Sequence, residues 1–83
     1  MITNSVIAAR TVGALEDAAN EAAGQPTQLA SVAIEVLTPR GLSRVETSIT
    51  RKTRTLIFAS ADVFNEKNER VALATSVHKI PAA

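Results

Sequence analysis

The chain has 83 residues and a formal net charge of +1, with 46% hydrophobic but only 2% aromatic residues and no cysteine. These counts exclude disulfides, thiolate zinc sites and cysteine nucleophiles, and we expect neither a metal site nor a nucleic-acid partner bound by base stacking. A single domain over residues 1–83 would be marginal as a monomer, and without a membrane-length apolar run or a signal peptide we expect a cytoplasmic protein with no membrane partner.

The first predicted element is a helix over residues 6–24. Small or apolar residues recur at helical spacing and predict one stripe against a core: Ala8, Val12, Leu15, Ala19, Ala22 and Ala23. Gly24 and Pro26 end the helix, because glycine supplies a left-handed cap and proline cannot continue the hydrogen bonding. The start stays open, because four residues are possible N-caps: Thr3, Asn4, Ser5 and Thr11.

Four later segments alternate with period two and are predicted strands: 28–37, 43–50, 55–64 and 69–80. In the second strand Val45, Thr47 and Ile49 are expected to point inward, whereas the third strand is apolar on both faces, as in a central strand. Residues 51–54 and 65–68 are the predicted connections on either side of that third strand. Since these connections are too short for crossover helices, the last three strands are expected to form an antiparallel meander.

Three runs of the sequence carry a resemblance to a known family: GALEDAANEAAG, SVAIEVLTP and RVETSITRKTRTLIFASADVFNEKNERVALATSVHKI. In this order they resemble the hot-dog fold thioesterases of the phenylacetate-pathway and 4-hydroxybenzoyl-CoA type, from about Thr11 to nearly the end of the chain. The resemblance implies an α+β hot-dog fold, in which one central Ala-rich helix packs on a four-stranded antiparallel sheet. It also implies a homodimer or homotetramer whose subunits pair edge to edge, with an acyl-CoA substrate at their interface.

Two departures from the family pattern affect the expected site. The first strand of the family, which precedes the helix, has no counterpart in this sequence, and this makes residues 43–50 an expected sheet edge. Family members also carry a His-Gly-Gly turn at the helix start, where this sequence has Ala8, Ala9 and Arg10. A backbone amide of that turn polarises the thioester carbonyl in the family, so the resemblance assigns the oxyanion role to Ala9 or Arg10.

Asp17 is the predicted catalytic residue, because the resemblance places the family's nucleophile or general base at this helix position. A one-residue shift of the alignment assigns the role to Glu16, whose spacing from Val12 predicts it to be the more buried of the two. A solvated surface carboxylate is the alternative for Asp17. The implied function is acyl-CoA thioester hydrolysis, with no cofactor beyond the coenzyme A of the substrate. The alternative is a non-catalytic hot-dog domain that binds an acyl-CoA or serves as an oligomerisation module.

A cluster of basic residues follows the acidic first half of the chain. Arg51, Lys52 and Arg54 fall in one predicted connection, and Arg40 falls in a turn at the other end of the preceding strand. By the resemblance these four residues bind the phosphates of coenzyme A, because guanidinium and ammonium groups suit phosphate oxygens. A solvated basic loop is the alternative.

The remaining candidates carry no predicted chemistry. His78 is the single histidine and is expected to be structural or surface-exposed. No sequence context of a nucleophile surrounds Ser31, Ser60 or Ser76. Four apolar side chains are expected to fill the core rather than line a pocket: Val12, Leu15, Phe58 and Phe64.

Overall fold

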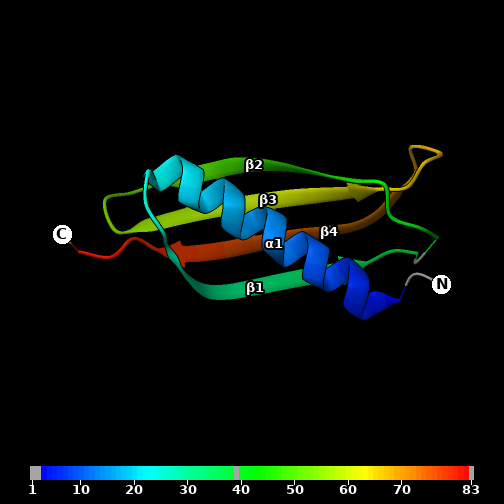
Figure 1. The fold of residues 1–83 in the computed structure, drawn as a ribbon, viewed down its shortest axis with the longest axis horizontal. Helices are drawn as coiled ribbons and strands as arrows, with labels where there is room; N and C mark the ends of the chain where they lie inside the picture. The colour runs from blue at the N-terminus through cyan, green and yellow to red at the C-terminus, as the bar shows by residue number, and fades with distance from the viewer. Residues whose placement is uncertain (1–2, 39, 83) are drawn as a thin grey trace.

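The structure is a computed structural model that describes residues 3–38 and 40–82, and it consists of one helix layer and one sheet layer (Figure 1). The elements follow in the order α1 (Asn4–Ala23), β1 (Gln28–Val36), β2 (Arg44–Lys52), β3 (Leu56–Phe64) and β4 (Arg70–Lys79). The strands form one antiparallel sheet in the order β1-β4-β3-β2. The predicted helix on a four-stranded antiparallel sheet is confirmed, as are the meander, the central place of β3 and the edge position of β2.

Both ends of α1 are capped. The Thr3 hydroxyl oxygen accepts a hydrogen bond from the Val6 amide at 3.3 Å, so of the four candidate caps Thr3 is the one used and the helix begins at Asn4. Gly24 closes the other end at φ 70°, a left-handed conformation that glycine adopts without steric cost. Thr11, one of the possible caps, lies inside the helix, where its hydroxyl donates to the Ile7 carbonyl oxygen at 2.7 Å. Among the described residues no helix combines the length and the apolar character needed to cross a membrane.

The core forms between one line of helix side chains and the two inner strands. Buried helix residues recur at every fourth position: Ile7, Thr11, Leu15 and Ala19. The buried apolar residues on the sheet side of this core are Ile57, Ala59, Ala61, Val63, Val71, Ala72 and Ala74. The predicted stripe is correct at Leu15 and Ala19 but wrong at its other four positions, which are only half-buried, because the contact line advances by four residues rather than alternating three and four.

α1 runs diagonally over one face of the sheet, from the end of β1 to the end of β2 (Figure 1). Val45 of β2 packs against the core, while Thr47 and Ile49 lie on the same side of the strand but stay exposed. The prediction that all three point inward therefore gives the correct side of the sheet but overstates burial. An edge strand has a neighbouring strand on one side only, so its side chains lose half of their lateral cover.

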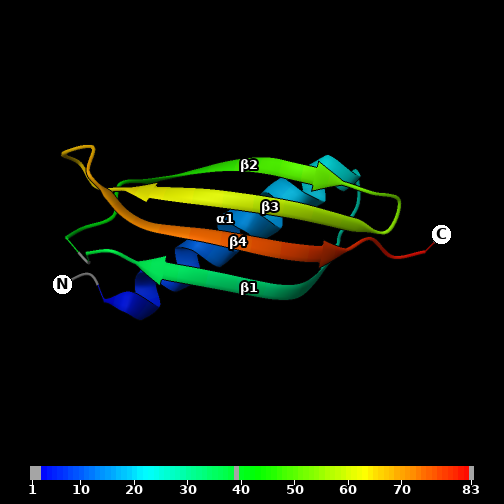
Figure 2. The ribbon, with the colours of Figure 1, turned by 180° about the vertical axis from the view of Figure 1, so that it is seen from behind.

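The face of the sheet opposite α1 is uncovered, and we call it the open face (Figure 2). Both phenylalanines lie on it, since they alternate with the β3 residues that α1 buries. Phe58 and Phe64 alternate along β3 with side chains buried under the helix, and both rings are half-buried. The expectation that they fill the core is wrong, because β3 is covered by the helix on one face only. Leu15, in contrast, is fully buried as expected.

His78 is fully buried on the helix side of β4. Its Nε2 lies 2.7 Å from the Ser76 hydroxyl oxygen, while its Nδ1 has no hydrogen-bond partner within the part of the chain that the structure describes. Burial lowers the pKa of the imidazole below 6.5, and the Glu16 carboxylate opposes this by a smaller amount. The fold therefore favours the neutral imidazole, and His78 has a structural place rather than a surface one.

We expect the free energy of unfolding to fall as the pH drops below 6.5, the ordinary pKa of the imidazole. The contribution of the neutral imidazole is complete above that value and is lost as the pH falls toward the lower folded pKa. Between the two values the stability falls with decreasing pH, because the unfolded chain binds a proton that the folded chain excludes. Urea unfolding on both sides of this pH measures the effect. His78→Gln keeps a neutral hydrogen-bonding side chain, so an equal pH step in that variant would contradict the assignment.

Candidate functional site

An open groove lies between α1 and β2. It has a volume of about 400 Å³ and is lined by Ala9, Arg10, Gly13, Ala14, Asp17 and Val45. The helix residues of this set share one flank of α1, because residues three, four and seven apart lie on the same side of an α-helix. The groove thus brings together three of the predicted site residues, the catalytic candidate Asp17 and the oxyanion candidates Ala9 and Arg10.

Arg10 and Asp17 carry opposite charges and lie at the two ends of the groove, with small residues between them. No heavy atom lies within 4 Å of the place that a Cβ on Gly13 would occupy, so this part of the floor has room for a ligand. Arg10 and Asp17 are seven residues apart, which corresponds to about 10 Å along the helix axis. Val45 adds an apolar wall from β2. Such a groove can offer one ligand both a carboxylate base and a guanidinium donor.

Glu16 does not line this groove. It lies toward His78 of β4, and its carboxylate partly offsets the fall in the pKa of that imidazole that burial causes. Because β3 separates β4 from β2 in the sheet, Glu16 and Asp17 belong to different flanks of the helix. Both side chains are exposed, so the expected greater burial of Glu16 is not seen. The two alignment alternatives thus correspond to two different places on the molecule.

The amides of Ala9 and Arg10 lie within a continuous helix. Beyond the first turn of an α-helix each N–H donates to the carbonyl four residues earlier, so both amides have partners inside α1. The group that this segment offers to a ligand is therefore the Arg10 side chain, which lines the groove.

Two of the predicted phosphate-binding residues belong to a strand. Arg51 and Lys52 are the last residues of β2, and only residues 53–55 connect β2 to β3, which corrects the predicted connection. A bulge after Ile49 determines on which face of the sheet the Arg51 and Lys52 side chains lie, because it pairs Arg51 with Phe58 on the open face. The Arg51 guanidinium carbon lies 6.0 Å from the centre of that ring.

Lys52 lies on the helix side of the same strand. Its Nζ donates to the Ala22 carbonyl oxygen at 2.8 Å, at the C-terminal end of α1. The last carbonyls of a helix lack partners within the helix and form the negative end of its dipole, so a cation stabilises them. One hydrogen bond thus fixes the helix end to the edge strand.

The two remaining predicted residues lie at opposite ends of the sheet. Arg54 is exposed in the β2–β3 connection, and Arg40 is exposed in the connection that precedes β2. The nine residues of β2 span about 30 Å, so one phosphate group cannot contact both ends. The structure therefore brings Lys52 and Arg54 to one end and separates Arg40 from them.

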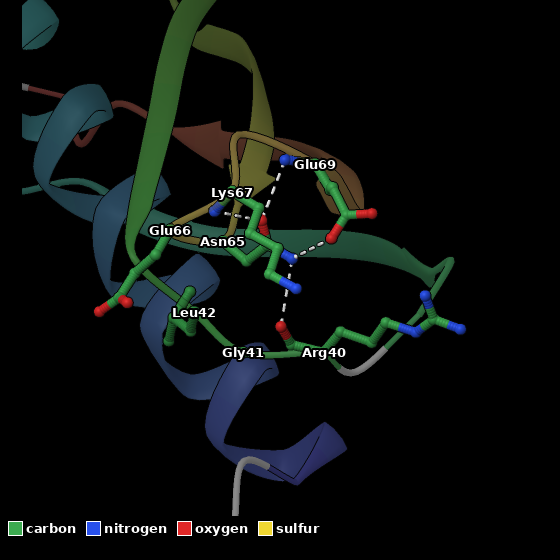
Figure 3. Close-up of a pocket in the computed structure, with 7 residues that line it drawn as sticks. All are labelled: Arg40, Gly41, Leu42, Asn65, Glu66, Lys67 and Glu69. Atoms are coloured by element: carbon green, nitrogen blue, oxygen red, sulfur yellow. Dashed lines mark hydrogen bonds between the residues drawn. The ribbon is translucent and has the colours of Figure 1, made fainter.

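Arg40 borders a second cleft, of about 430 Å³, beside the β3–β4 hairpin (Figure 3). Asn65 is buried there and donates from Nδ2 to the Arg40 carbonyl oxygen at 3.1 Å and to Glu69 Oε1 at 2.9 Å. Its Oδ1 accepts from the amides of Lys67 and Glu69, both at 3.0 Å. The whole side-chain amide is used within the protein, and the Arg40 guanidinium points away from it (Figure 3). We interpret this cleft as a structural junction between the hairpin and the β1–β2 connection.

The sequence analysis missed the junction role of Asn65. It predicted the hairpin at residues 65–68, one residue shorter than the observed connection. An asparagine at the start of a turn is a known signal, because its side chain accepts hydrogen bonds from backbone amides further along. The bond to Arg40 has no such signal, since it joins residues 25 positions apart. Gly13, Ala14 and Val45 were missed for the same reason, because the groove exists only once the helix lies beside β2.

No family model and no curated protein matches this sequence, whereas solved structures match its fold. A protein of the thioesterase superfamily superimposes on 95% of this chain with a TM-score of 0.86 and 18% sequence identity. A Bacillus halodurans protein crystallised with CoA matches 95% of this chain with a TM-score of 0.85 and 21% identity. A Chromobacterium violaceum protein matches 94% with a TM-score of 0.76 and 12% identity.

These similarities concern the fold. Together with one Ala-rich helix on a four-stranded antiparallel sheet, they confirm the predicted α+β hot-dog fold. This chain spans 61% of the length of the thioesterase-superfamily protein, 55% of the Bacillus halodurans protein and 61% of the Chromobacterium violaceum protein.

Replacing Asn65 with Ala should lower the free energy of unfolding by about 2–4 kcal/mol, because it removes the four partly buried hydrogen bonds of this buried side chain. The urea midpoint measures this loss. Asn68→Gly is the matched control, since it removes only an exposed contact with Arg44 and keeps a residue that tolerates the φ of 63°. We expect it to cost less than about 1 kcal/mol. Equal midpoints for Asn65→Ala and the unmodified protein would contradict the junction role.

Proposed function

We propose that the chain hydrolyses an acyl-CoA thioester in the groove between α1 and β2. The observation that carries this proposal is the place of Asp17, an exposed carboxylate in a groove with a small-residue floor and the Arg10 guanidinium at its other end. The fold supports the proposal, because it is shared with a protein of the thioesterase superfamily and with a protein crystallised with CoA.

In the proposed reaction Asp17 acts as a general base. Its carboxylate takes a proton from a water molecule, whose oxygen forms a bond to the thioester carbonyl carbon. The carbon–sulfur bond of the tetrahedral intermediate then breaks, and the proton passes to the sulfur, so the products are a carboxylic acid and the CoA thiol. Direct attack by Asp17 gives the same products through an anhydride that water hydrolyses.

Arg10 is the proposed electrostatic partner of the reaction. The tetrahedral intermediate carries negative charge on the former carbonyl oxygen, and donors directed at that oxygen lower the barrier. A guanidinium donates charge-assisted hydrogen bonds, which suits this task where the backbone amides are already bonded within α1. The thioester would then lie across Gly13 and Ala14, between Arg10 and Asp17.

Self-association is part of the proposal, as a homodimer or homotetramer in the cytoplasm whose subunits pair along β1. Charged side chains on an edge strand oppose pairing. β2 carries four of them, Arg44, Glu46, Arg51 and Lys52, whereas β1 carries only Glu35. Val32, on β1, is 37% exposed, so this edge offers both free backbone groups and apolar surface.

Pairing along β1 makes the Glu16 flank a second candidate place for the reaction. This flank faces β4, the neighbour of β1, so in such a dimer it lies nearer to the partner than the Asp17 groove does. Which carboxylate is needed for turnover therefore reports whether the substrate lies beside β2 or between the subunits.

The phosphates of coenzyme A are proposed to bind at the end of the sheet that carries Arg51, Lys52 and Arg54. Lys52 lies on the helix side of β2 and contacts the C-terminal end of α1, which is the end nearer to Asp17. Arg54 follows two residues later, in the β2–β3 connection. Arg40, at the other end of β2, is the alternative phosphate contact.

A non-catalytic domain that binds an acyl-CoA, or that serves only in oligomerisation, is the second candidate function. The observation that favours it is the continuous helix from Asn4 to Ala23, which leaves Ala9 and Arg10 without a free backbone amide for an oxyanion.

Asp17→Asn should reduce thiol release by at least about 100-fold, the effect of losing a general base. Release of free thiol from short, medium, branched and aromatic acyl-CoA thioesters measures it. Glu16→Gln is the matched control, because it makes the same carboxylate-to-amide change on the neighbouring residue and the other flank. Since both side chains are exposed, neither variant should change the melting temperature much.

The possible outcomes separate the candidates. Loss of turnover only in Glu16→Gln would move the reaction to the flank near β4. Unchanged rates in both variants would rule out the catalytic assignment. No release from any thioester by the folded, unmodified protein would favour the non-catalytic domain.

Arg54→Ala should raise KM about tenfold and leave kcat unchanged, because a phosphate contact is made equally in the ground state and in the transition state. Arg40→Ala is the control at the far end of β2 and should leave both constants unchanged. Steady-state kinetics with the preferred thioester measures both variants. A KM rise in Arg40→Ala alone would place the phosphates at the opposite end of the sheet.

A further inference from the structure

The flank of α1 that faces β2 extends beyond the groove in both directions. The buried line of the helix advances by four residues, so the neighbouring rows of side chains on the helix do the same. One such row passes through the groove and consists of Val6, Arg10, Ala14, Ala18 and Ala22. Lys52 of β2 donates to the Ala22 carbonyl oxygen, so this row leads along β2 to the proposed phosphate site.

Asp17 divides this flank into two parts. The part between Asp17 and Lys52 leads to the cations that are proposed to hold the phosphates of coenzyme A. In an extended thioester the acyl chain and the sulfur substituent leave the carbonyl carbon in opposite directions. With the coenzyme toward Lys52 and the carbonyl over Gly13 and Ala14, the acyl chain therefore extends toward the start of α1.

The part of the flank toward the helix start offers apolar contacts. Val6 lies one turn before Arg10 and is 41% exposed, although the neighbouring Ile7 is fully buried. Val45 forms the wall on β2, and Leu42, which precedes it in the chain, is half-buried against the cluster around Ile7. The stem of Arg10 is also aliphatic and can cover an apolar chain while the guanidinium reaches the carbonyl.

The length of this part limits the size of the chain. Gly13 and Val6 are seven residues apart, which corresponds to about 10 Å along the helix axis. An extended chain advances about 1.2 Å per bond, so about eight carbons span this distance. Both phenylalanines lie on the open face, so an aromatic acyl group has no ring to stack on in the groove.

We propose that the acyl group is a straight aliphatic chain of about six to eight carbons, which lies along α1 from Gly13 to Val6 with Val45 on its other side. Val6 and Val45 are then the residues that determine the preferred chain length. The placement of the chain rests on the proposed function, from which the positions of the carbonyl and of the coenzyme are taken.

Isothermal titration calorimetry of the full chain with S-alkyl-CoA thioethers tests the proposal. These probes keep the coenzyme and the alkyl chain but have no carbonyl, so they bind without being hydrolysed. From the ethyl to the octyl thioether we expect the affinity to rise about twofold per methylene, because an open groove covers about half of each group. The dodecyl thioether should bind at most about twofold tighter than the octyl one, since its last carbons pass beyond Val6.

Val6→Thr and Val45→Thr keep the shape of the side chain and replace one methyl group with a hydroxyl group. Each should weaken octyl binding about fourfold, and Val6→Thr should leave ethyl binding unchanged. Ile49→Thr is the control, because Ile49 is also exposed on the helix side of β2 but lies toward Lys52. It should change ethyl and octyl binding by the same factor. Circular dichroism verifies that each variant is folded.

Equal affinity for the ethyl and octyl thioethers would overturn the proposal, as would a chain-length dependence that both valine variants retain. A dependence that only Ile49→Thr removes would also overturn it, because the chain would then run toward Lys52. Absence of binding by every thioether would overturn the coenzyme site as well. Failure of the proposed hydrolysis is recognised separately: octyl binding that depends on Val6, without thiol release from octanoyl-CoA, would leave the chain site standing and remove the reaction.

Discussion

The contact between α1 and the small side chains of β3 and β4 is the constraint on which the structure depends. Leu15 packs against Ala59, Ala61 and Ala74, three residues with a single side-chain carbon each. The helix can therefore approach the sheet closely, and one leucine fills the space that three alanines leave. Tight packing rather than large apolar area holds the two layers together, since the buried helix line has only Ile7 and Leu15 as large apolar members.

A narrow contact line leaves both flanks of the helix open, and this separates two places where chemistry is possible. On one flank Arg10 and Asp17 face β2 across small residues. On the other flank Glu16 lies toward β4 and its buried His78. A helix with larger side chains would cover both flanks, so the alanine content that allows close packing also exposes the charged residues. Because α1 covers one face of the sheet only, the other face stays open.

The sequence was sufficient for the fold because hydrophobic alternation, Gly24 and the short connections all indicate the same architecture. It was less reliable wherever the structure depends on contacts between distant segments. The line of buried helix residues differs from the predicted one because Thr11 is buried although it is polar. Its hydroxyl donates to the Ile7 carbonyl oxygen, so it is hydrogen-bonded inside the core. Phe58 was assigned to the core because apolar type does not reveal which face of a strand the helix covers. The sequence analysis predicted the groove only at Ala9, Arg10 and Asp17, since the space beside Gly13 and Ala14 exists only once β2 lies next to the helix.

The bulge in β2 has a consequence for how this protein tolerates changes in length. Beyond Ile49 one extra residue shifts the alternation of the strand, so that Arg51 stacks on Phe58 and Lys52 reaches the Ala22 carbonyl. Thr50 is the residue that has no partner in this pairing, so a chain without it would still place Arg51 opposite Phe58 and Lys52 opposite Ile57. An added residue at the same point would instead have to be absorbed by a wider bulge, or it would exchange the faces of Arg51 and Lys52. This strand therefore accepts the loss of one residue at the bulge more readily than the gain of one.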